Sequence, residues 1–175
     1  MKFSHKGDRG ETSLLGGQRI PKFDPRPDTY GTLDEASSML GVVKSMTQDE
    51  RIRTIVFDVQ KDLLLLGAEL SMLPEDAGRY EYRLTKDHVD HIEEIIDSLQ
   101  ENFEMKQEFI YPGGTALSAF IDVARTIIRR AERKAAKLRY EGIITNEYIN
   151  SYLNRLADML FTLARYEEHT ARPVT

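Results

Sequence analysis

The stretch Tyr111-Pro-Gly-Gly-Thr-Ala-Leu-Ser118, continued by residues 119–139, decides the fold. A Pro-Gly-Gly turn interrupts the chain, and apolar side chains then recur at the three- and four-residue steps of one helical face. The members of this face are Phe120, Val123, Ala124, Ile127, Ala131, Ala135 and Leu138. The pattern predicts a long amphipathic helix that begins after the turn and packs against other helices.

A second face of the same helix carries a series of cations, here called the basic ridge. Its members are Arg125, Arg129, Arg130, Arg133, Lys134, Lys137 and Arg139. Glu132 is the only acidic residue among them, so residues 125–139 have a net charge of +6 in a chain whose net charge is −5. Like charges four residues apart repel by about a few tenths of a kcal/mol per pair. Either the ridge is a solvated face, or carboxylates of neighbouring helices or a bound polyanion such as a triphosphate compensate it.

The composition bounds the class of protein. A chain of 175 residues, with 41% hydrophobic and 30% charged residues, fits one globular domain with a real core. No apolar run approaches the roughly 18 residues of a membrane helix, and the N-terminus lacks an apolar signal core. The absence of cysteine excludes disulfides and thiolate chemistry. We therefore expect a single-domain cytoplasmic protein, and its acidic pI near 5.5 disfavours general nucleic-acid binding.

The first 28 residues are rich in glycine and proline and show no periodicity, which predicts a loop or short extended strands. Glycines let a backbone approach a ligand closely, and such loops can hold phosphates through their N–H groups. Hydroxyls and cations in the same segment would suit that role, namely Thr12, Ser13, Lys6, Arg9, Arg19 and Lys22. The spacing matches neither a Walker A loop nor a dinucleotide fingerprint. A flexible tail is the alternative.

Four further helices are expected from three- and four-residue apolar spacing. The five helices are residues 28–46, residues 48–73, a helix that begins at Thr85, the helix of the basic ridge to Tyr140, and a helix from Thr145 or Asn146 to residue 168. Pro74 and Gly142 follow the second and fourth helices and would end them. Long helices joined by short links predict an all-α antiparallel five-helix bundle.

Two polar groupings could carry chemistry. His88 and His91 lie three residues apart beside acidic residues, which could hold a metal ion. A di-iron bundle would need Glu-x-x-His on two helices, and no such pair exists, so exposed helix surface is favoured. Asn154 and Asp158 share a face of the last helix. They are expected either to pair with an arginine of the fourth helix or to contact a ligand.

Three groups of residues, read together, point to a known family. They are Lys6-Gly-Asp-Arg-Gly-Glu-Thr-Ser-Leu14 with residues 30–35, Tyr111-Pro-Gly-Gly114, and residues 124–133 with residues 152–158. In order and content they resemble the ATP:cob(I)alamin adenosyltransferases of the propanediol-utilisation (PduO) type, over residues 3–168. The resemblance implies a ferritin-like five-helix bundle that forms a homotrimer with active sites between subunits. It also implies transfer of the 5′-deoxyadenosyl group of ATP to cob(I)alamin, which forms adenosylcobalamin for a cobalamin-dependent enzyme and releases triphosphate.

The resemblance assigns roles to individual residues. The ATP-binding set that it implies is Lys6, Gly7, Asp8, Arg9, Gly10, Thr12, Ser13, Lys22, Arg129, Arg130, Glu132, Arg133 and Asn154. Mg²⁺ would arrive with the triphosphate, without a metal site made by the protein alone. On the corrin side, Arg125 would pair with Asp34 across the subunit boundary, and Phe109 would cover the lower face of the corrin. The catalytic set is Phe109, Asp34, Arg125 and Arg129.

This chain departs from the family pattern at a few positions. Asp122 stands where many members have histidine, Ala36 and Ser37 replace a Leu-Asn pair, and His5 replaces a common threonine. The departures at Asp122 and Ser37 concern details of the corrin side and leave the nucleotide block intact. Two other functions would also explain a basic ridge on a helical bundle, namely nucleotide binding without corrin chemistry and RNA binding.

Overall fold

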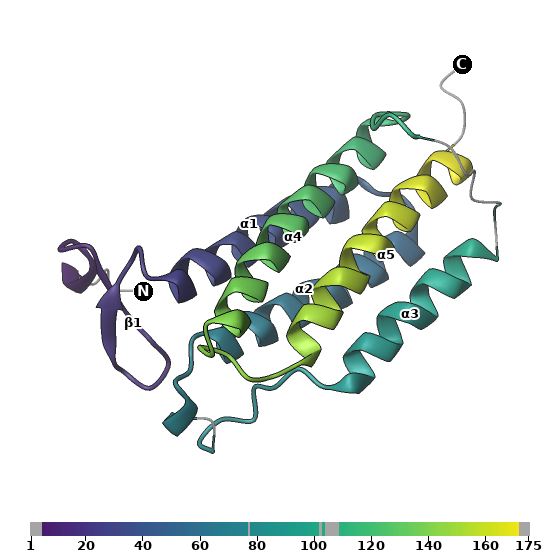
Figure 1. The fold of residues 1–175 in the computed structure, drawn as a ribbon. Coiled ribbons are helices and arrows are strands. Elements are labelled where there is room, and N and C mark those ends of the chain that lie inside the picture. Colours follow the sequence, from purple (N-terminus) through teal and green to yellow (C-terminus); the bar gives the residue numbers. More distant parts are fainter. Residues whose placement is uncertain (1–4, 77, 102, 104–108, 172–175) are drawn as a thin grey trace.

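The computed structural model describes residues 5–76, 78–101, 103 and 109–171. Five long helices run side by side as an antiparallel bundle, and a small hairpin lies beyond the N-terminal end of the first helix (Figure 1). The helices are α1 Pro25–Met46, α2 Glu50–Leu70, α3 Lys86–Gln100, α4 Ala116–Tyr140 and α5 Tyr148–Thr170. The predicted all-α five-helix bundle is confirmed.

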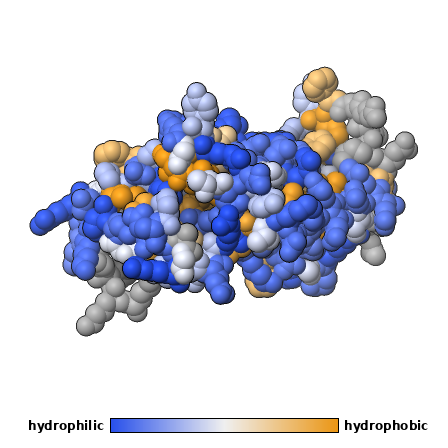
Figure 2. Space-filling model, turned by 60° about the horizontal axis from the view of Figure 1, so that its bottom comes forward, coloured by the Kyte–Doolittle hydropathy of each residue, from blue (hydrophilic) through white to orange (hydrophobic). Residues whose placement is uncertain are grey.

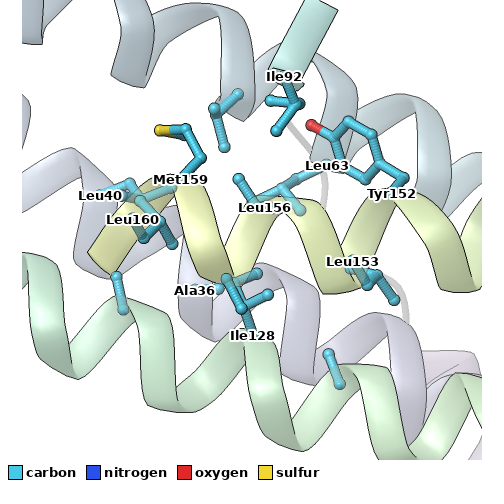
Figure 3. Close-up of a cluster of buried hydrophobic side chains, with 14 of the residues drawn as sticks. Ala36, Leu40, Leu63, Ile92, Ile128, Tyr152, Leu153, Leu156, Met159 and Leu160 are labelled. Carbon is cyan, nitrogen blue, oxygen red and sulfur yellow. The ribbon is translucent and has the colours of Figure 1, made fainter. Parts of the chain in front are cut away.

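The core lies between the helices, with α4 packed against α1 and α5, α2 against α1, and α3 against α5. Figure 3 shows part of it, where Leu156 and Leu160 of α5 meet Leu40 of α1 and Ile128 of α4. The expected apolar stripe of α2 is buried throughout, and its members are Ile52, Ile55, Val56, Val59, Leu63, Leu66 and Leu70. Burial of one such side chain stabilises the fold by about 1.5–3 kcal/mol.

The first two helices differ from their predicted limits. Helix α1 begins at Pro25 rather than near residue 28, because the Asp24 side chain accepts a hydrogen bond from the Arg26 N–H at 2.9 Å and proline suits the first helical turn. Asp34 therefore lies in the third turn of the helix, beyond the first turn in which a carboxylate interacts favourably with the helix dipole. Helix α2 is shorter than predicted because Asp49 caps its start and it ends at Leu70, before Pro74.

Helix α4 buries most of the expected face, including Ala124, Ala131, Ala135 and Leu138, but its buried surface also extends to residues outside that face. Val123 is 42% exposed, whereas Ile121 and Ile128 are completely buried. The helix contacts both α1 and α5, so its buried surface is wider and is rotated towards these two residues. This rotation also buries Asp122, with consequences for the polar contacts of α4. The predicted end is confirmed, since Gly142 takes a φ of +70°, which favours glycine after a helix.

The glycine-rich N-terminal segment is an ordered hairpin. Its strands are β1 Glu11–Ser13 and β2 Arg19–Pro21, paired antiparallel with Thr12 opposite Ile20. The backbone N–H of Leu15 donates to the carbonyl of Ser71 at 2.8 Å, and Leu14 is buried. The expectation of short extended strands is therefore confirmed, and the hairpin is attached to the end of α2. Short 3-10 turns occur at His5–Gly7 and Pro74–Asp76.

The exterior is mostly polar. Figure 2 shows one face of the molecule, where hydrophilic side chains cover most of the surface and hydrophobic ones form separate small areas. Within the described ranges, no helix combines the length and apolarity that a bilayer crossing requires.

One polar contact enters the core and gives a testable pH dependence. The Tyr152 hydroxyl donates to the Asp62 carboxylate at 2.9 Å, and burial raises the pKa of Asp62 although this bond opposes the rise. A carboxyl with a raised folded pKa binds more protons when folded, so it lowers stability as pH rises between its unfolded and folded pKa values. We expect Asp62→Asn to increase the free energy of unfolding at pH 7. This gain in stability should disappear below the unfolded pKa of Asp62, where the carboxyl is protonated in both states. Urea denaturation from pH 3 to 7 measures it, with Asp97→Asn on the exposed face of α3 as the control; an advantage that is constant with pH would contradict the expectation.

Candidate functional site

Arg129 is the centre of the basic ridge and joins α4 to α5. Its guanidinium donates to Asn154 Oδ1 at 2.8 Å, to Asp158 Oδ1 at 2.7 Å and to Glu132 Oε2 at 3.0 Å. The expected shared face of Asn154 and Asp158 is confirmed, because both accept from this one arginine. The Arg129 side chain keeps 35% of its surface exposed, so the cluster opens to solvent.

Acids of this chain also accompany other members of the ridge. Arg130 forms an ion pair with Glu35 of α1, and Lys134 contacts Asp28 Oδ1 at 2.6 Å and Thr32 Oγ1 at 2.9 Å. Compensation by carboxylates of neighbouring helices, one of the explanations open from the sequence, is therefore present. In the part of the chain that the structure describes, Arg133 and Arg139 are the ridge residues without an ion pair.

These ion pairs do not prevent the ridge from binding an anion. Arg130 and Glu35 expose 46% and 58% of their side chains, and Asp158 exposes 45%. Exposed pairs of this kind contribute about 0–1 kcal/mol each, whereas hydrogen bonds from guanidinium to phosphate are charge-assisted and bidentate. A triphosphate could therefore replace the acids as the partner of the ridge.

The N-terminal hairpin assembles most of the residues that the resemblance assigns to ATP. Lys22 and Gly10 are joined by a backbone hydrogen bond of 2.8 Å, and Arg19 donates to the carbonyl of Lys6 at 2.7 Å. Asp8 accepts from the His5 ring at 3.2 Å. A hollow of about 520 Å³ is lined by His5, Lys6, Arg9, Glu11 and Arg19. Arg19, which the resemblance did not include among the ATP residues, also lines this hollow.

A second hollow, of about 530 Å³, lies between the hairpin, α1 and α2. It brings Thr12 and Ser13 of the hairpin together with Asp34 and Ser37 of α1. Burial raises the pKa of Tyr30 in the same wall, and a hydrogen bond with Thr12 opposes the rise. Asp34, which the resemblance assigns to the corrin side, therefore shares a hollow with Thr12 and Ser13, which it assigns to ATP.

The remaining corrin-side residues lie elsewhere in the chain. Phe109 is fully exposed in the segment before α4. Arg125 projects from α4, and its Nε donates to Asp122 Oδ1 of the same chain at 2.8 Å, not to Asp34. The hairpin contacts the ends of α1 and α2, whereas Arg129 is tied to α5. Neither hollow at the hairpin is lined by Arg129, Arg130 or Arg133, the ATP residues proposed on α4.

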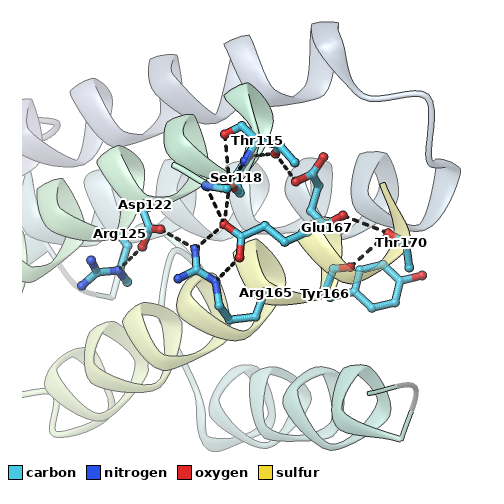
Figure 4. Close-up of polar contacts among 10 residues, drawn as sticks. Thr115, Ser118, Asp122, Arg125, Arg165, Tyr166, Glu167 and Thr170 are labelled. Atoms are coloured by element: carbon cyan, nitrogen blue, oxygen red, sulfur yellow. Dashed lines mark hydrogen bonds and ion pairs between the residues drawn. The ribbon is translucent and has the colours of Figure 1, made fainter. Parts of the chain in front are cut away.

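A network of charged side chains behind Arg125 was not predicted from the sequence. Figure 4 shows Asp122 between Arg125 and Arg165, with Thr115 and Ser118 at the start of α4 close to the end of α5. Arg165 and Glu167 are buried, and desolvation raises the pKa of Glu167 although the Thr115 hydroxyl donates to it. The sequence signals were two pairs of opposite charge, each three residues apart within its own helix, Asp122 with Arg125 and Arg165 with Glu168.

The two histidines of α3 contact groups of their own helix and its cap. His88 Nδ1 accepts from the backbone N–H of Thr85 at 3.2 Å and so takes part in the cap of α3. His91 lies 3.7 Å from Glu94 on the exposed side of the helix. Among the described residues, no three His, Asp or Glu side chains are grouped so that they could hold a metal ion.

Comparison of the sequence with known proteins finds named relatives. The corrinoid adenosyltransferase of Citrobacter freundii is 38% identical over 168 residues, which cover 96% of this chain and 95% of that protein. The corrinoid adenosyltransferase of Mycobacterium leprae is 37% identical and is covered to 88%. The corrinoid adenosyltransferase PduO of Salmonella typhimurium is 34% identical, and the chain covers 50% of its length.

Solved structures agree with these relatives. A variant of the PduO-type ATP:corrinoid adenosyltransferase of Lactobacillus reuteri, complexed with cobalamin and ATP, has a TM-score of 0.87 and 33% identity, over 95% of this chain and 90% of the other. A second variant, complexed with ATP, gives a TM-score of 0.86 at the same identity, over 95% and 93% of the two chains. The class of protein is therefore that of the helical-bundle adenosyltransferases. The family model described as cobalamin adenosyltransferase matches residues 2–167, and the chain belongs to this family.

Proposed function

We propose that this protein transfers the 5′-deoxyadenosyl group of ATP to cob(I)alamin, forming adenosylcobalamin and releasing triphosphate. The observation that carries the proposal is the solvent-facing cluster of Arg129, Asn154 and Asp158 on a bundle of this family. Cobalt is the nucleophile and the 5′ carbon of ATP is its target. The carbon–oxygen bond to the triphosphate breaks as the cobalt–carbon bond forms, so the protein needs no base of its own.

The nucleotide half of the reaction requires positioning and neutralisation of charge. Arg129, Arg130 and Arg133 would hold the phosphates, with Asn154 and Glu132 beside them. The hairpin, through Lys6–Gly10, Thr12, Ser13 and Lys22, would close over the nucleotide. Fixed guanidinium groups stabilise the charge that develops on a departing triphosphate, and correct alignment of the reacting atoms lowers the entropic cost.

The corrin half requires control of the lower axial position of cobalt. Phe109 is exposed before α4, as a residue that covers a large ligand must be. A hydrophobic ring there would keep water and other bases off the metal, and loss of an axial ligand makes reduction to cob(I)alamin easier. Asp34 and Arg125 would pair across the boundary between two subunits and hold the corrin in place.

A homotrimer with active sites between subunits is part of the proposal. In one chain the hollow that contains Asp34 is not lined by Arg129, Asn154 or Asp158, and Arg125 bonds to Asp122 and not to Asp34. A neighbouring copy could bring its hairpin to the ridge and its Asp34 to Arg125. Measurement of mass by light scattering, with and without ATP, tests this assembly, and a monomer under both conditions contradicts it.

Mg²⁺ and the cellular setting complete the proposal. Glu132 and Asp158 are each bonded to Arg129, so Mg²⁺ would be held mainly by the phosphates and water. We also propose a cytoplasmic location and delivery of the product to a cobalamin-dependent enzyme, which cell fractionation and co-purification would test.

The decisive assay mixes the protein with ATP, Mg²⁺ and chemically reduced cobalamin. Formation of adenosylcobalamin is followed by the cobalt absorbance, and release of triphosphate is measured in the same sample. One triphosphate per cobalt–carbon bond is the expected result. ATP binding without product would indicate a nucleotide-binding bundle, and salt-sensitive RNA binding that ATP does not compete with would indicate an RNA-binding bundle.

The proposal gives Asp34 a role in corrin binding and not in ATP binding. Substitution of Asp34 tests this division. We expect Asp34→Asn to raise the KM for cob(I)alamin roughly tenfold, because a charge-assisted pair becomes neutral. The KM for ATP should change by less than about twofold. Steady-state kinetics with each substrate varied in turn measures both, and Asp87→Asn on α3 is the control. Equal losses for both substrates would contradict the division.

A further inference from the structure

The side chain of Asp122 is a buried carboxylate shared by two arginines. Asp122 is only 3% exposed, and carboxylates are rarely buried unless they are paired. Oδ1 accepts from Arg125 Nε at 2.8 Å, and Oδ2 accepts from Arg165 Nη2 at 2.7 Å. Both oxygens are therefore committed to guanidinium groups on opposite sides, as Figure 4 shows. Such a carboxylate fixes the distance between the two guanidinium groups and the orientation of each.

Arg125 uses only one edge of its guanidinium in this contact. The Nε edge faces Asp122, and no described residue accepts a hydrogen bond from Nη1 or Nη2. The side chain retains 24% of its exposure. Because a guanidinium is a planar fork with five N–H donors, fixing the Nε edge also fixes the direction of the four remaining donors. The outer edge of Arg125 is thus oriented and available to a second anionic partner.

Arg165 connects the same carboxylate to the turn before α4. It contacts both oxygens of Glu168 at 3.1 Å. Glu168 Oε1 also accepts from Ser118 Oγ at 2.7 Å and from the Gly114 N–H at 3.1 Å. A Cβ on Gly114 would lie 2.6 Å from this oxygen, so a larger residue there would displace the Glu168 side chain from this position. The network therefore continues from Arg125 to the Pro-Gly-Gly turn that follows Phe109.

We propose that Asp122 is a positioning residue, which holds Arg125 with its outer edge directed at the corrin side of the active site. This inference rests on the proposed function, because the role of Arg125 in corrin binding belongs to that proposal. Asp122 does not touch the substrate; it acts through Arg125. Through Arg165 and Glu168 it also links the orientation of Arg125 to the turn after Phe109, so both corrin contacts share one support.

A double-mutant cycle tests the proposal. Asp122→Asn should raise the KM for cob(I)alamin about tenfold and leave the KM for ATP within about twofold, because a charged acceptor is lost. In an Arg125→Ala background, the same substitution should change the KM for cob(I)alamin by less than about twofold. An effect that persists in that background, or a loss shared equally by both substrates, would overturn the proposal. Wild-type protein that forms no adenosylcobalamin in this assay would instead refute the proposed function.

Two further measurements cover the case in which Asp122→Asn does not fold. Asp122→Glu keeps the buried charge but moves it by one methylene, so it should fold and still raise the KM for cob(I)alamin about threefold; an unchanged KM would contradict the proposal. Nitrogen-15 NMR of the arginine side chains gives a readout without activity. The Nε–H of Arg125 should exchange slowly with water in the wild type and rapidly in the Asp122 variants, and fast exchange in the wild type would overturn the geometry.

Discussion

Replacement of Arg129 by alanine is expected to lower kcat/KM for ATP by roughly 10²- to 10³-fold, the effect of removing one fixed donor from a developing negative charge. Arg129 is the only residue of the described ridge that bonds to both Asn154 and Asp158. Its loss would leave the triphosphate without its central partner and would remove one donor from each of Asn154, Asp158 and Glu132. Product formation at varied ATP concentration measures the change.

The control for this prediction lies on the same helix. Arg139→Ala removes an exposed cation at the end of the ridge and should leave kcat/KM within about twofold, since surface substitutions are usually mild. Melting temperatures of both variants separate lost binding from lost stability. Normal turnover and an unchanged KM for ATP in Arg129→Ala would contradict the assignment of the ridge to the phosphates.

Replacement of Phe109 by alanine is expected to separate stability from activity. The ring is fully exposed in the free chain, so the melting temperature should change by no more than about 1–2 °C. If the ring covers the corrin, about 1.5–3 kcal/mol of burial is lost with it, which corresponds to a roughly 10- to 100-fold decrease in kcat/KM for the corrinoid. Calorimetry and the adenosylation assay measure the two quantities.

Tyr140 provides the matched control for Phe109, because it is 94% exposed at the far end of α4. Tyr140→Ala should alter neither stability nor turnover. The electron paramagnetic resonance spectrum of bound cob(II)alamin gives a second readout, since it reports the ligand below cobalt. A spectrum and turnover unchanged by Phe109→Ala would refute the proposed position of the ring.

The helices could be predicted because each is specified by residues close together in the sequence. The apolar stripe of α2 repeats at three and four residues and is buried as expected, and Thr85 and Gly142 lie at the helix limits that their chemistry favours. The start of α1 was placed too late because Asp24 and Pro25 lie inside a proline-rich segment. Local signals for a loop and for a helix cap overlap there.

The full extent of the buried face of α4 could not be predicted, because the burial of Ile121, Asp122 and Ile128 depends on how the helix lies between two neighbours. The sequence places Asp122 next to the apolar face but does not specify Arg165 as its partner, 43 residues later. The same limit applies to the candidate site. Its residue types and order were recognisable along the chain, whereas the separation of the hairpin from Arg129 depends on the packing of the bundle.

The sequence by itself determined the five helices, the concentration of cations on one of them and the resemblance to a family, since periodicity, charge and motifs are properties of neighbouring residues. Only the tertiary structure decided which acids accompany those cations and which carboxylate orients Arg125. Such contacts join positions far apart in the chain, and their strength depends on burial and distance, which no local pattern contains.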